Sequence, residues 1–334
     1  MAKTYVPGAG KEKGSAPALL DLIICRVPGL KRNERIILIE KFEKIEDFLL
    51  LSIRDIEVLL GRPLRDRSWN MSQLQAMAEK DAAFSLKLGI RLVSWRESAY
   101  PPLLREIFDP PAVIFYRGKL PDPEKPLVAV VGTRKPSQAA RARAFALGRE
   151  LGEAGIPVVS GLALGIDAMA HRGNIEGKAP TVAVLGSSPD QVYPSSNRDL
   201  GRRILETGGI ILSEYPPFTR PNKWYFPARN RIISALARGV VIVEAPEKSG
   251  ALITAKFALD QDRDLWVDKV GVSSSRGLGT ARLAEDGAGV IAAAADILAE
   301  WNIERINGPG QKEKILHNGA DLASSLAEYL DIKL

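Results

Sequence analysis

The sequence predicts an α/β protein with a doubly wound, mostly parallel sheet, preceded by a small all-helical domain. From about residue 127 onward, short β-branched runs alternate with helical stretches, as in successive strand–helix–strand units. The runs are apolar throughout, which is expected of strands covered by helices on both faces. Before them, apolar residues recur at helical spacing, and the breakers Pro28-Gly29 and Gly61-Arg62-Pro63 separate the helices.

The apolar runs and the segments between them define the expected sheet and its helices. We expect strands at Leu127–Val131, Ile156–Val159, Thr181–Leu185, Gly209–Leu212, Gly239–Val243, Leu265–Val267 and Gly289–Ile291. We expect helices at about Ser137–Ala154, Ile166–Glu176, Arg198–Glu206, Asn230–Ala237, Ala251–Gln261 and Thr280–Asp286. In such a sheet, ligands bind beyond the carboxyl ends of the strands.

Changes in composition divide the chain into four parts. We expect a disordered arm at residues 1–17, the helical domain at 18–95, the α/β domain at 96–300, and a tail at 301–334. The tail is polar apart from one amphipathic stretch, Leu316–Leu330. The turn Val27-Pro28-Gly29-Leu30 suggests a helix-hairpin-helix, and a plain helical bundle is the alternative.

The bulk composition suits a cytoplasmic protein with a polyanionic partner. The formal net charge of +6 is a mild bias toward such a partner. The single cysteine, Cys25, excludes an intrachain disulfide framework and fits a reducing compartment. No run approaches the roughly 20 apolar residues of a membrane span, and residues 1–14 lack the apolar core of a signal peptide. One cysteine and two histidines, His171 and His317, cannot supply a Cys/His metal cluster, so we expect neither a metal nor a cofactor.

Small and polar residues follow four of the expected strands. They are Gly132-Thr133-Arg134-Lys135, Ser160-Gly161 with Gly165-Ile166-Asp167, Gly186-Ser187-Ser188, and Ser249-Gly250. Glycines let the backbone approach a ligand closely, and a following helix N-terminus offers free N–H groups to phosphate. Glycine also serves packing in such turns, but four loops on one edge favour a phosphate-rich ligand.

The common nucleotide and catalytic motifs are absent. The sequence has no G-x-x-x-x-G-K-[ST], and no G-x-G-x-x-G follows the first strand, which disfavours Walker-type ATPases and NAD binding. Arg134 and Lys135 instead place cationic charge in this loop, which suits a nucleic-acid phosphate. His171 lies one turn after Asp167, a pairing more typical of helix or core stabilisation than of catalysis. We therefore expect no catalytic residues.

The segment Pro221–Arg231 interleaves three aromatic residues with lysine and arginine. Aromatic faces beside backbone-neutralising cations are the usual design for binding single strands of nucleic acid. In the alternative interpretation Trp224 and Tyr225 belong to the core, and Arg229 pairs with a carboxylate such as Glu214 or Glu244. The residues alone leave these two interpretations about equal.

A series of spaced motifs over about residues 100–291 resembles the DNA-processing protein A (DprA/Smf) family. They are Tyr100-Pro101, Asp109-Pro110-Pro111, Val131-Gly132-Thr133-Arg134, Ser160-Gly161-x-Ala163-x-Gly165-Ile166-Asp167, Ala170-His171, Ala183-Val184-Leu185-Gly186, Tyr193-Pro194, Ser213-Glu214-Tyr215-Pro216, Phe226-Pro227-x-Arg229-Asn230-Arg231-Ile232-Ile233, Val243-Glu244-Ala245 and Ser249-Gly250-x-Leu252-Ile253-Thr254-Ala255.

The resemblance implies an extended Rossmann-like domain that dimerises, binds and protects incoming single-stranded DNA, and loads the RecA recombinase in DNA uptake and recombination. It implies that Arg134, Lys223 and Phe226 line the DNA pocket. With the loops above, the predicted DNA-binding residues are Gly132, Thr133, Arg134, Ser160, Gly161, Gly165, Lys223, Phe226, Arg229, Asn230, Ser249 and Gly250.

Several positions depart from the family pattern. Leu164 stands where an arginine is usual, and Asp268-Lys269-Val270-Gly271 replaces Val-Pro-Gly. Gly279-Thr280-Ala281-Arg282-Leu283 replaces Gly-Asn-x-Leu-Ile, and Gly186-Ser187-Ser188 replaces a glycine-rich turn. The tail is too short for the complete winged-helix domain of many relatives, and is an incomplete remnant at most.

Two other functions compete with single-strand binding. Related Rossmann-like domains bind or hydrolyse small nucleotide derivatives, in which case Glu244 or Asp167 is the candidate acid or base. The third possibility is a recombination scaffold with weakened DNA contacts, which the departures leave open. The aromatic and basic segment discriminates against a mononucleotide pocket, which does not need it.

Overall fold

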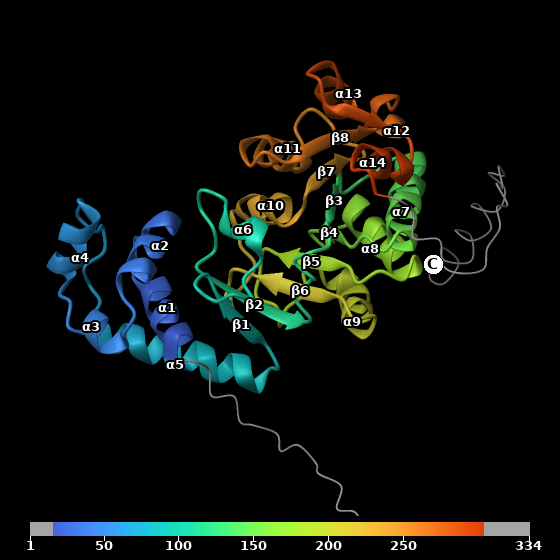
Figure 1. Ribbon diagram of the computed structural model, residues 1–334. Coiled ribbons are helices and arrows are strands. Elements are labelled where there is room, and N and C mark those ends of the chain that lie inside the picture. Colours follow the sequence, from blue (N-terminus) through green and yellow to red (C-terminus); the bar gives the residue numbers. More distant parts are fainter. Residues whose placement is uncertain (1–15, 304–334) are drawn as a thin grey trace, which may run out of the picture.

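The computed structural model of the chain describes residues 16–303. A helical region is followed by a nine-stranded mixed sheet with helices on both faces, as expected (Figure 1). The expected arm and tail, including Leu316–Leu330, lie almost entirely outside the described residues.

The helical region comprises α1 (Ala16–Arg26), α2 (Arg32–Lys41), α3 (Ile45–Leu49), α4 (Ile53–Leu60) and α5 (Met71–Lys87). Ser52 caps α4 by accepting a hydrogen bond from the Asp55 N–H, and the helix ends at Leu60, before Gly61, whose φ of 65° favours glycine. Buried side chains from all five helices and from the first two strands form one core, including Leu20, Ile23, Leu38, Phe48, Ile56, Leu74, Val113 and Phe115.

The strand order is β1-β2-β6-β5-β4-β3-β7-β8-β9. The strands are β1 (Arg91–Ser94), β2 (Val113–Gly118), β3 (Val128–Val131), β4 (Val158–Ser160), β5 (Val182–Leu185), β6 (Ile210–Ser213), β7 (Gly239–Ile242), β8 (Asp264–Asp268) and β9 (Gly289–Ile291). β2 is antiparallel to both β1 and β6, and the other neighbours are parallel. From β3 the chain proceeds outward through β4 to β6, then returns to β7 on the other side of β3, so the strand order reverses between β3 and β7.

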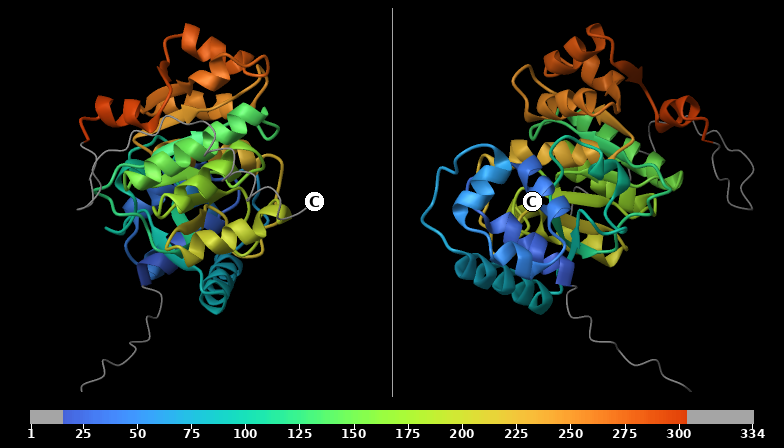
Figure 2. Two further views of the ribbon diagram at one scale, coloured as in Figure 1. Left: turned by 90° about the vertical axis from the view of Figure 1, so that its right-hand side faces the viewer. Right: turned by 60° about the vertical axis from the view of Figure 1, so that its left-hand side comes forward.

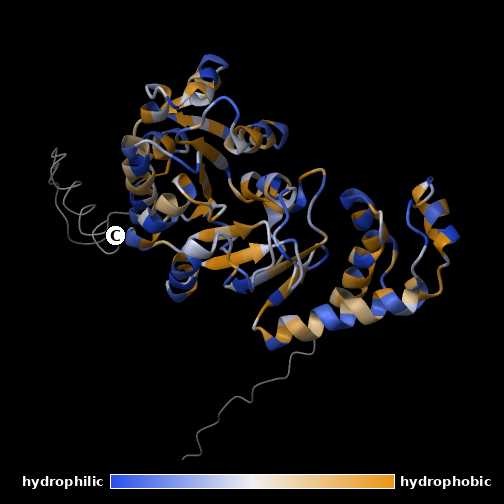
Figure 3. Ribbon diagram, turned by 180° about the vertical axis from the view of Figure 1, so that it is seen from behind, coloured by the Kyte–Doolittle hydropathy of each residue, from blue (hydrophilic) through white to orange (hydrophobic). Residues whose placement is uncertain are grey.

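Two helix layers cover the sheet. The remaining helices are α6 (Pro102–Arg105), α7 (Gln138–Glu153), α8 (Ile166–Glu176), α9 (Arg198–Glu206) with the 3₁₀ turn η1 (Ser195–Asn197), α10 (Tyr225–Leu236), α11 (Gly250–Asp260), α12 (Lys269–Val272), α13 (Leu278–Glu285) and α14 (Ala294–Glu300). One face packs against α6, α10 and α11, and the other against α7, α8, α9 and α14. Figure 2 gives two further views of these layers, and Figure 3 shows the strands as the most hydrophobic part of the domain. Each helix within residues 16–303 is too short or too polar to span a bilayer.

The structure adds two strands that the sequence did not predict. β1 and β2 precede the alternating part of the chain and flank a proline-rich stretch at residues 101–111, so neither forms part of a strand–helix–strand repeat. β1 begins at Arg91, before the expected start of the α/β domain at residue 96, and pairs with β2.

One predicted helix boundary was wrong by five residues. We expected this helix at Asn230, but α10 begins at Tyr225. Pro227 reads as a breaker in the sequence, yet it lies in the first turn of α10, where a missing backbone N–H costs no helical hydrogen bond.

Helices α7 and α8 approach each other through glycines. A Cβ on Gly148 would lie 2.3 Å from the carbonyl oxygen of Ala170, and one on Gly173 would lie 2.0 Å from that of Phe145. An added methyl group at either glycine would collide with the backbone of the other helix. The helices therefore cannot accept it without moving apart. Because both helices begin in loops at the carboxyl edge of the sheet, this packing fixes the distance between the two loops.

We expect Gly173→Ala to lower the free energy of unfolding by about 1–3 kcal/mol, because overpacking forces α7 and α8 apart. Helix propensity alone predicts the opposite sign, a gain of roughly 0.5–1 kcal/mol. Urea denaturation measures the difference, with Glu176→Ala, an exposed position on the same helix, as the control. A Gly173→Ala variant as stable as the parent would contradict this packing.

Candidate nucleic-acid interface

A cavity of about 1410 Å³ opens beyond the carboxyl ends of β3 and β7, where the strand order reverses. This is the position at which open α/β sheets bind their ligands. The predicted residues that line it are Gly132, Thr133, Arg134, Lys223, Phe226, Arg229, Asn230, Ser249 and Gly250. Three other predicted residues are not among those that line it: Ser160, Gly161 and Gly165.

Arg134 and two aromatic rings form the centre of the cavity wall. The Arg134 guanidinium carbon lies 5.8 Å from the centre of the Phe226 ring. The rings of Phe226 and Tyr193 have centroids 5.5 Å apart and an interplanar angle of 42°. A Cβ on Gly186 would lie 2.9 Å from Cδ1 of Phe226, so the ring packs where only glycine leaves room. The arrangement presents a cation and aromatic surface to the same space.

Six exposed cations line the cavity and have no carboxylate partner among residues 16–303. They are Arg134, Lys135, Arg220, Lys223, Lys248 and Arg276. The Lys223 ammonium instead lies 5.0 Å from the ring centre of Trp224, which is 70% exposed. Unneutralised cations beside exposed aromatic rings suit a ligand that offers both phosphates and bases.

Arg229 connects the loop after β4 with strand β5, and the two are called here the cavity floor. Its guanidinium is buried and donates hydrogen bonds to the carbonyl oxygens of Gly161, at 2.9 Å, and Val184. Burial lowers the pKa of Arg229 to about 10, against the attraction of nearby Asp167. The pairing with Glu214 or Glu244 that the sequence left open is absent from its hydrogen bonds and ion pairs in the described part of the chain. This geometry makes Arg229 a support for the loop after β4.

Asp167 supports the same loop. Its Oδ2 accepts hydrogen bonds from the backbone N–H groups of Gly161, at 3.1 Å, and Ala163, at 3.4 Å. Burial raises the pKa of the Asp167 carboxyl, while Arg229 counteracts that shift. A Cβ on Gly161 would lie 2.7 Å from Asp167 Oδ2 and 2.4 Å from Arg229 Nη2, so glycine is required between them.

Glu244, at the end of β7, is fully buried and holds two loops. Its Oε2 accepts from the Ser137 N–H at 2.7 Å, and its Oε1 accepts from the Ser274 hydroxyl at 2.6 Å. Its backbone carbonyl accepts from the Thr133 N–H at 2.8 Å. Glu244 thereby sets the path of the loop that carries Arg134.

His171 lies in the core, and its side chain hydrogen-bonds to Thr181 instead of Asp167. Its Nδ1 is 2.7 Å from the Thr181 hydroxyl, which donates its own proton to the Val158 carbonyl at 2.8 Å. The imidazole must therefore donate from Nδ1, and its buried Nε2 has no hydrogen-bond partner in the described structure. Burial lowers its pKa to about 3, so the ring is neutral at physiological pH. These contacts are those of a structural histidine.

Ser249 and Gly250 begin α11 on the far side of the cavity. The Ser249 hydroxyl accepts from the Ala251 N–H at 3.2 Å and caps the helix. The Asn230 side chain donates to the Gly250 carbonyl at 3.1 Å, which joins α10 to α11. No Cβ contact restricts Gly250, so its backbone faces open space.

The structure adds cavity residues that the sequence interpretation did not select. They include Tyr193, Gln191, Lys248 and Arg276. Tyr193 was visible as part of a family motif, but only the fold brings it to Phe226. Arg276 reaches the cavity from the segment before α13, far along the chain, and no local pattern marked it.

Two of the departures from the family pattern have local explanations. Asp268 is buried, pairs with Arg143 Nε at 2.8 Å and accepts from the Val270 N–H at 2.9 Å to cap α12. The Thr280 hydroxyl accepts from the Ala245 N–H at 2.7 Å and ties α13 to the end of β7. Leu164 is 45% exposed in the loop after β4, and nothing in the structure explains the absence of a cation there.

Within residues 16–303, no three His, Cys, Asp or Glu side chains gather in an arrangement that could hold a metal ion. Apart from Asp167, the charged side chains that line the cavity are arginines and lysines. A sequence model of the DNA recombination-mediator protein A family matches residues 91–302, which includes all of the sheet. The chain belongs to this family.

Similar proteins agree with the family assignment. Protein Smf of Synechocystis sp. is 42% identical over 221 residues, which are 65% of this chain and 55% of that protein. The chain thus spans little more than half the length of this relative. The X-ray structure of DNA processing protein A from Streptococcus pneumoniae has a TM-score of 0.69 and 32% identity, covering 84% of this chain and 95% of that one. DNA processing protein A from Helicobacter pylori, described for its single-stranded DNA binding mode, has a TM-score of 0.57 and 30% identity, covering 64% of this chain and 95% of that one.

Proposed function

We propose that this member of the DNA recombination-mediator protein A family binds and protects single-stranded DNA in the cavity at the carboxyl edge of its sheet. The observation that carries the proposal is the cluster of Arg134, Phe226 and Tyr193, with unpaired Lys223 and Lys135 around it. Cations meet the strand backbone, and the rings stack with bases that a duplex would hide. The likeness to the Helicobacter pylori protein supports the proposal.

Hydrolysis of a small nucleotide derivative fits the geometry less well. Of the two candidate acid–base residues, Glu244 has both carboxylate oxygens engaged by Ser137 and Ser274, and Asp167 uses its Oδ2 to hold the loop after β4. The cavity volume of about 1410 Å³ also exceeds the roughly 300–1,000 Å³ of ordinary small-molecule sites. We therefore propose that the protein binds its ligand without catalytic residues, metal or cofactor. We also propose that it is cytoplasmic.

We expect single strands to bind at least about tenfold more tightly than duplex, with little sequence preference, because stacking needs exposed base faces. A fluorescence titration with an oligonucleotide, a duplex of equal sequence and free nucleotides measures this. Equal affinity for strand and duplex would refute the stacking argument. Tight binding of free nucleotides alone would favour the small-ligand alternative.

We expect Arg134→Ala and Lys223→Ala each to flatten the dependence of log affinity on log salt by about 0.7, the loss of one phosphate contact. Phe226→Ala should instead cost about 1–3 kcal/mol of binding free energy with nearly unchanged salt slope. The matched control is Lys125→Ala, an exposed lysine at the opposite end of β3. Melting temperatures separate lost contacts from lost folding, and folded variants that all bind like the parent would show that the pocket is wrongly placed.

We further propose that the chain forms a homodimer and loads the RecA recombinase, as the family resemblance implies. Sedimentation of the chain alone should give twice the protomer mass of 36.3 kDa at micromolar concentration, and added RecA should co-sediment. A monomer at that concentration would contradict the dimer. Independent sedimentation of RecA, with and without single-stranded DNA, would contradict its recruitment.

A further inference from the structure

The helical domain touches the segment that carries part of the proposed DNA site. This segment, residues 214–224, joins β6 to α10 and is called here the β6–α10 segment. It ends at Lys223 and Trp224, directly before Phe226 in the first turn of α10. Its path therefore determines where Lys223 lies relative to Arg134, which also lines the cavity.

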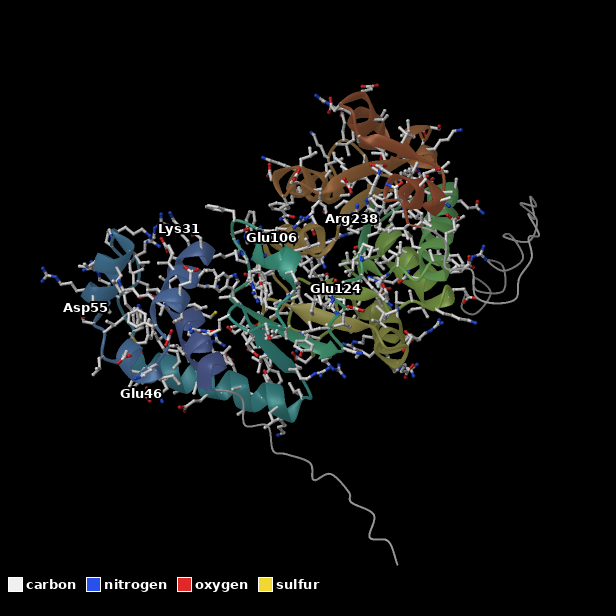
Figure 4. The ribbon with its side chains drawn as sticks, viewed as in Figure 1. Lys31, Glu46, Asp55, Glu106, Glu124 and Arg238 are labelled. Carbon is white, nitrogen blue, oxygen red and sulfur yellow. The ribbon has the colours of Figure 1, made fainter. Side chains whose placement is uncertain are left out.

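The first contact is an ion network at the start of the segment. Glu214 Oε1 accepts from Arg231 Nη2 at 2.7 Å and from Arg32 Nε at 3.1 Å. Arg231 Nε also pairs with Asp109 Oδ2 at 3.0 Å, and the Arg32 Nη1 lies 3.6 Å from the same oxygen. Arg32 is the first residue of α2, so one cation from the helical domain joins a network that spans the end of β6, α10 and the loop before β2. Figure 4 marks the neighbouring Lys31 at the start of α2.

The network has a buried half and a half-exposed half. The side chains of Arg231 and Glu214 are 1% and 9% exposed, whereas those of Arg32 and Asp109 are 35% and 32% exposed. Burial alone would raise the pKa of the Glu214 carboxyl, but Arg231 and Arg32 outweigh that effect and hold the pKa below its ordinary value. The two arginines balance the two carboxylates, so loss of one arginine leaves a negative charge uncompensated.

The second contact lies in the middle of the segment. Phe84 of α5 packs edge-on against Phe218, with ring centroids 4.9 Å apart and an interplanar angle of 88°. Phe218 has a φ of 63°, an unfavourable conformation for a non-glycine residue, and its N–H donates to Asp190 Oδ1 at 3.3 Å. Such a backbone conformation persists only where its surroundings hold it.

A third contact carries these constraints to α10. The Tyr215 ring stacks on that of Tyr225, the first residue of α10, with centroids 4.1 Å apart and an interplanar angle of 23°. The helical domain thus contacts the β6–α10 segment at its start through Arg32 and in its middle through Phe84. Asp190 and Ser188 of the loop after β5 also hold the middle of the segment, and the Tyr215–Tyr225 stack ties it to α10.

We propose that the helical domain positions the DNA site, with Arg32 and Phe84 as positioning residues that preorganise the β6–α10 segment. The proposal rests on the single-strand binding proposed above. A loop ordered before binding loses less conformational entropy when the strand arrives, so affinity rises without any added contact to DNA. Neither Arg32 nor Phe84 lines the cavity.

Hydrogen exchange of the DNA-free protein tests the positioning directly. We expect faster amide exchange across residues 214–224 in Arg32→Gln and in Phe84→Ala, with exchange of the central strands unchanged. The matched controls are Arg67→Gln, which breaks an Arg–Glu pair inside the helical domain, and Leu86→Ala, an exposed position on α5. Unchanged exchange of the segment in both positioning variants would overturn the proposal, whether or not the parent binds DNA.

Affinity against salt then separates positioning from direct contact. We expect roughly three- to tenfold weaker binding of a single-stranded oligonucleotide for both variants, with the salt slope of the parent. A slope flattened by about 0.7 for Arg32→Gln would mean that Arg32 neutralises a phosphate itself, and would overturn its positioning role. Phe84→Ala carries no charge change and therefore repeats the test independently. Absence of single-strand binding by the parent would refute the proposed function alone, since the exchange experiment does not use DNA.

Discussion

The buried guanidinium of Arg229 joins elements that the chain reaches at very different points. It bonds to the carbonyl of Gly161 after β4 and to that of Val184 within β5, while its own backbone belongs to α10. An arginine can serve this purpose because it stays charged even when burial lowers its pKa, and its several donors point in fixed directions. The cavity floor, the glycine that fits between Arg229 and Asp167, and the position of Phe226 three residues earlier all depend on these hydrogen bonds.

Buried charged groups also hold loops elsewhere along the carboxyl edge of the sheet, while the exposed cations of the cavity form no ion pair in the described part of the chain. Glu244 fixes the loop of Arg134 by accepting from Ser137 and Ser274. Glu214 fixes the start of the segment that leads to Lys223. Because Glu244 and Glu214 are buried and engaged internally, they form no ion pair with Arg134, Lys135 or Lys223.

Much of the α/β domain could be predicted from the sequence, because fully covered strands are continuous apolar runs and each is followed by a helix of ordinary length. α8 and α9 begin and end at the expected residues. β1 and β2 were not predicted because antiparallel strands outside that repeat carry no comparable signal. The first turn of α10 was not predicted because Pro227 lies in it. The sequence does not show whether a proline ends a helix or lies in its first turn.

The candidate site was harder to predict than the fold. The sequence indicated many of its residues, but not which of them support the loops from inside and which face the cavity. Gly161 and Val184 lie 68 and 45 residues from Arg229, so no local pattern indicates that this arginine faces inward. Tyr193 meets Phe226 only once β5 and α10 are placed side by side. For Asp268, the sequence showed the departure from the family pattern but not the compensating Arg143 on a helix 125 residues earlier.

Strand β2 belongs to two cores at once. Its Val113 and Phe115 face the helical domain, and its Ile114 and Tyr116 face the α/β domain. The two domains are therefore not modules that can be separated at the proline-rich stretch between them. A fragment beginning at residue 96 would lack β1, and would present both an apolar face and a row of unpaired backbone groups to solvent. Exposed edges of that kind recruit other strands, so such a fragment would be prone to aggregate.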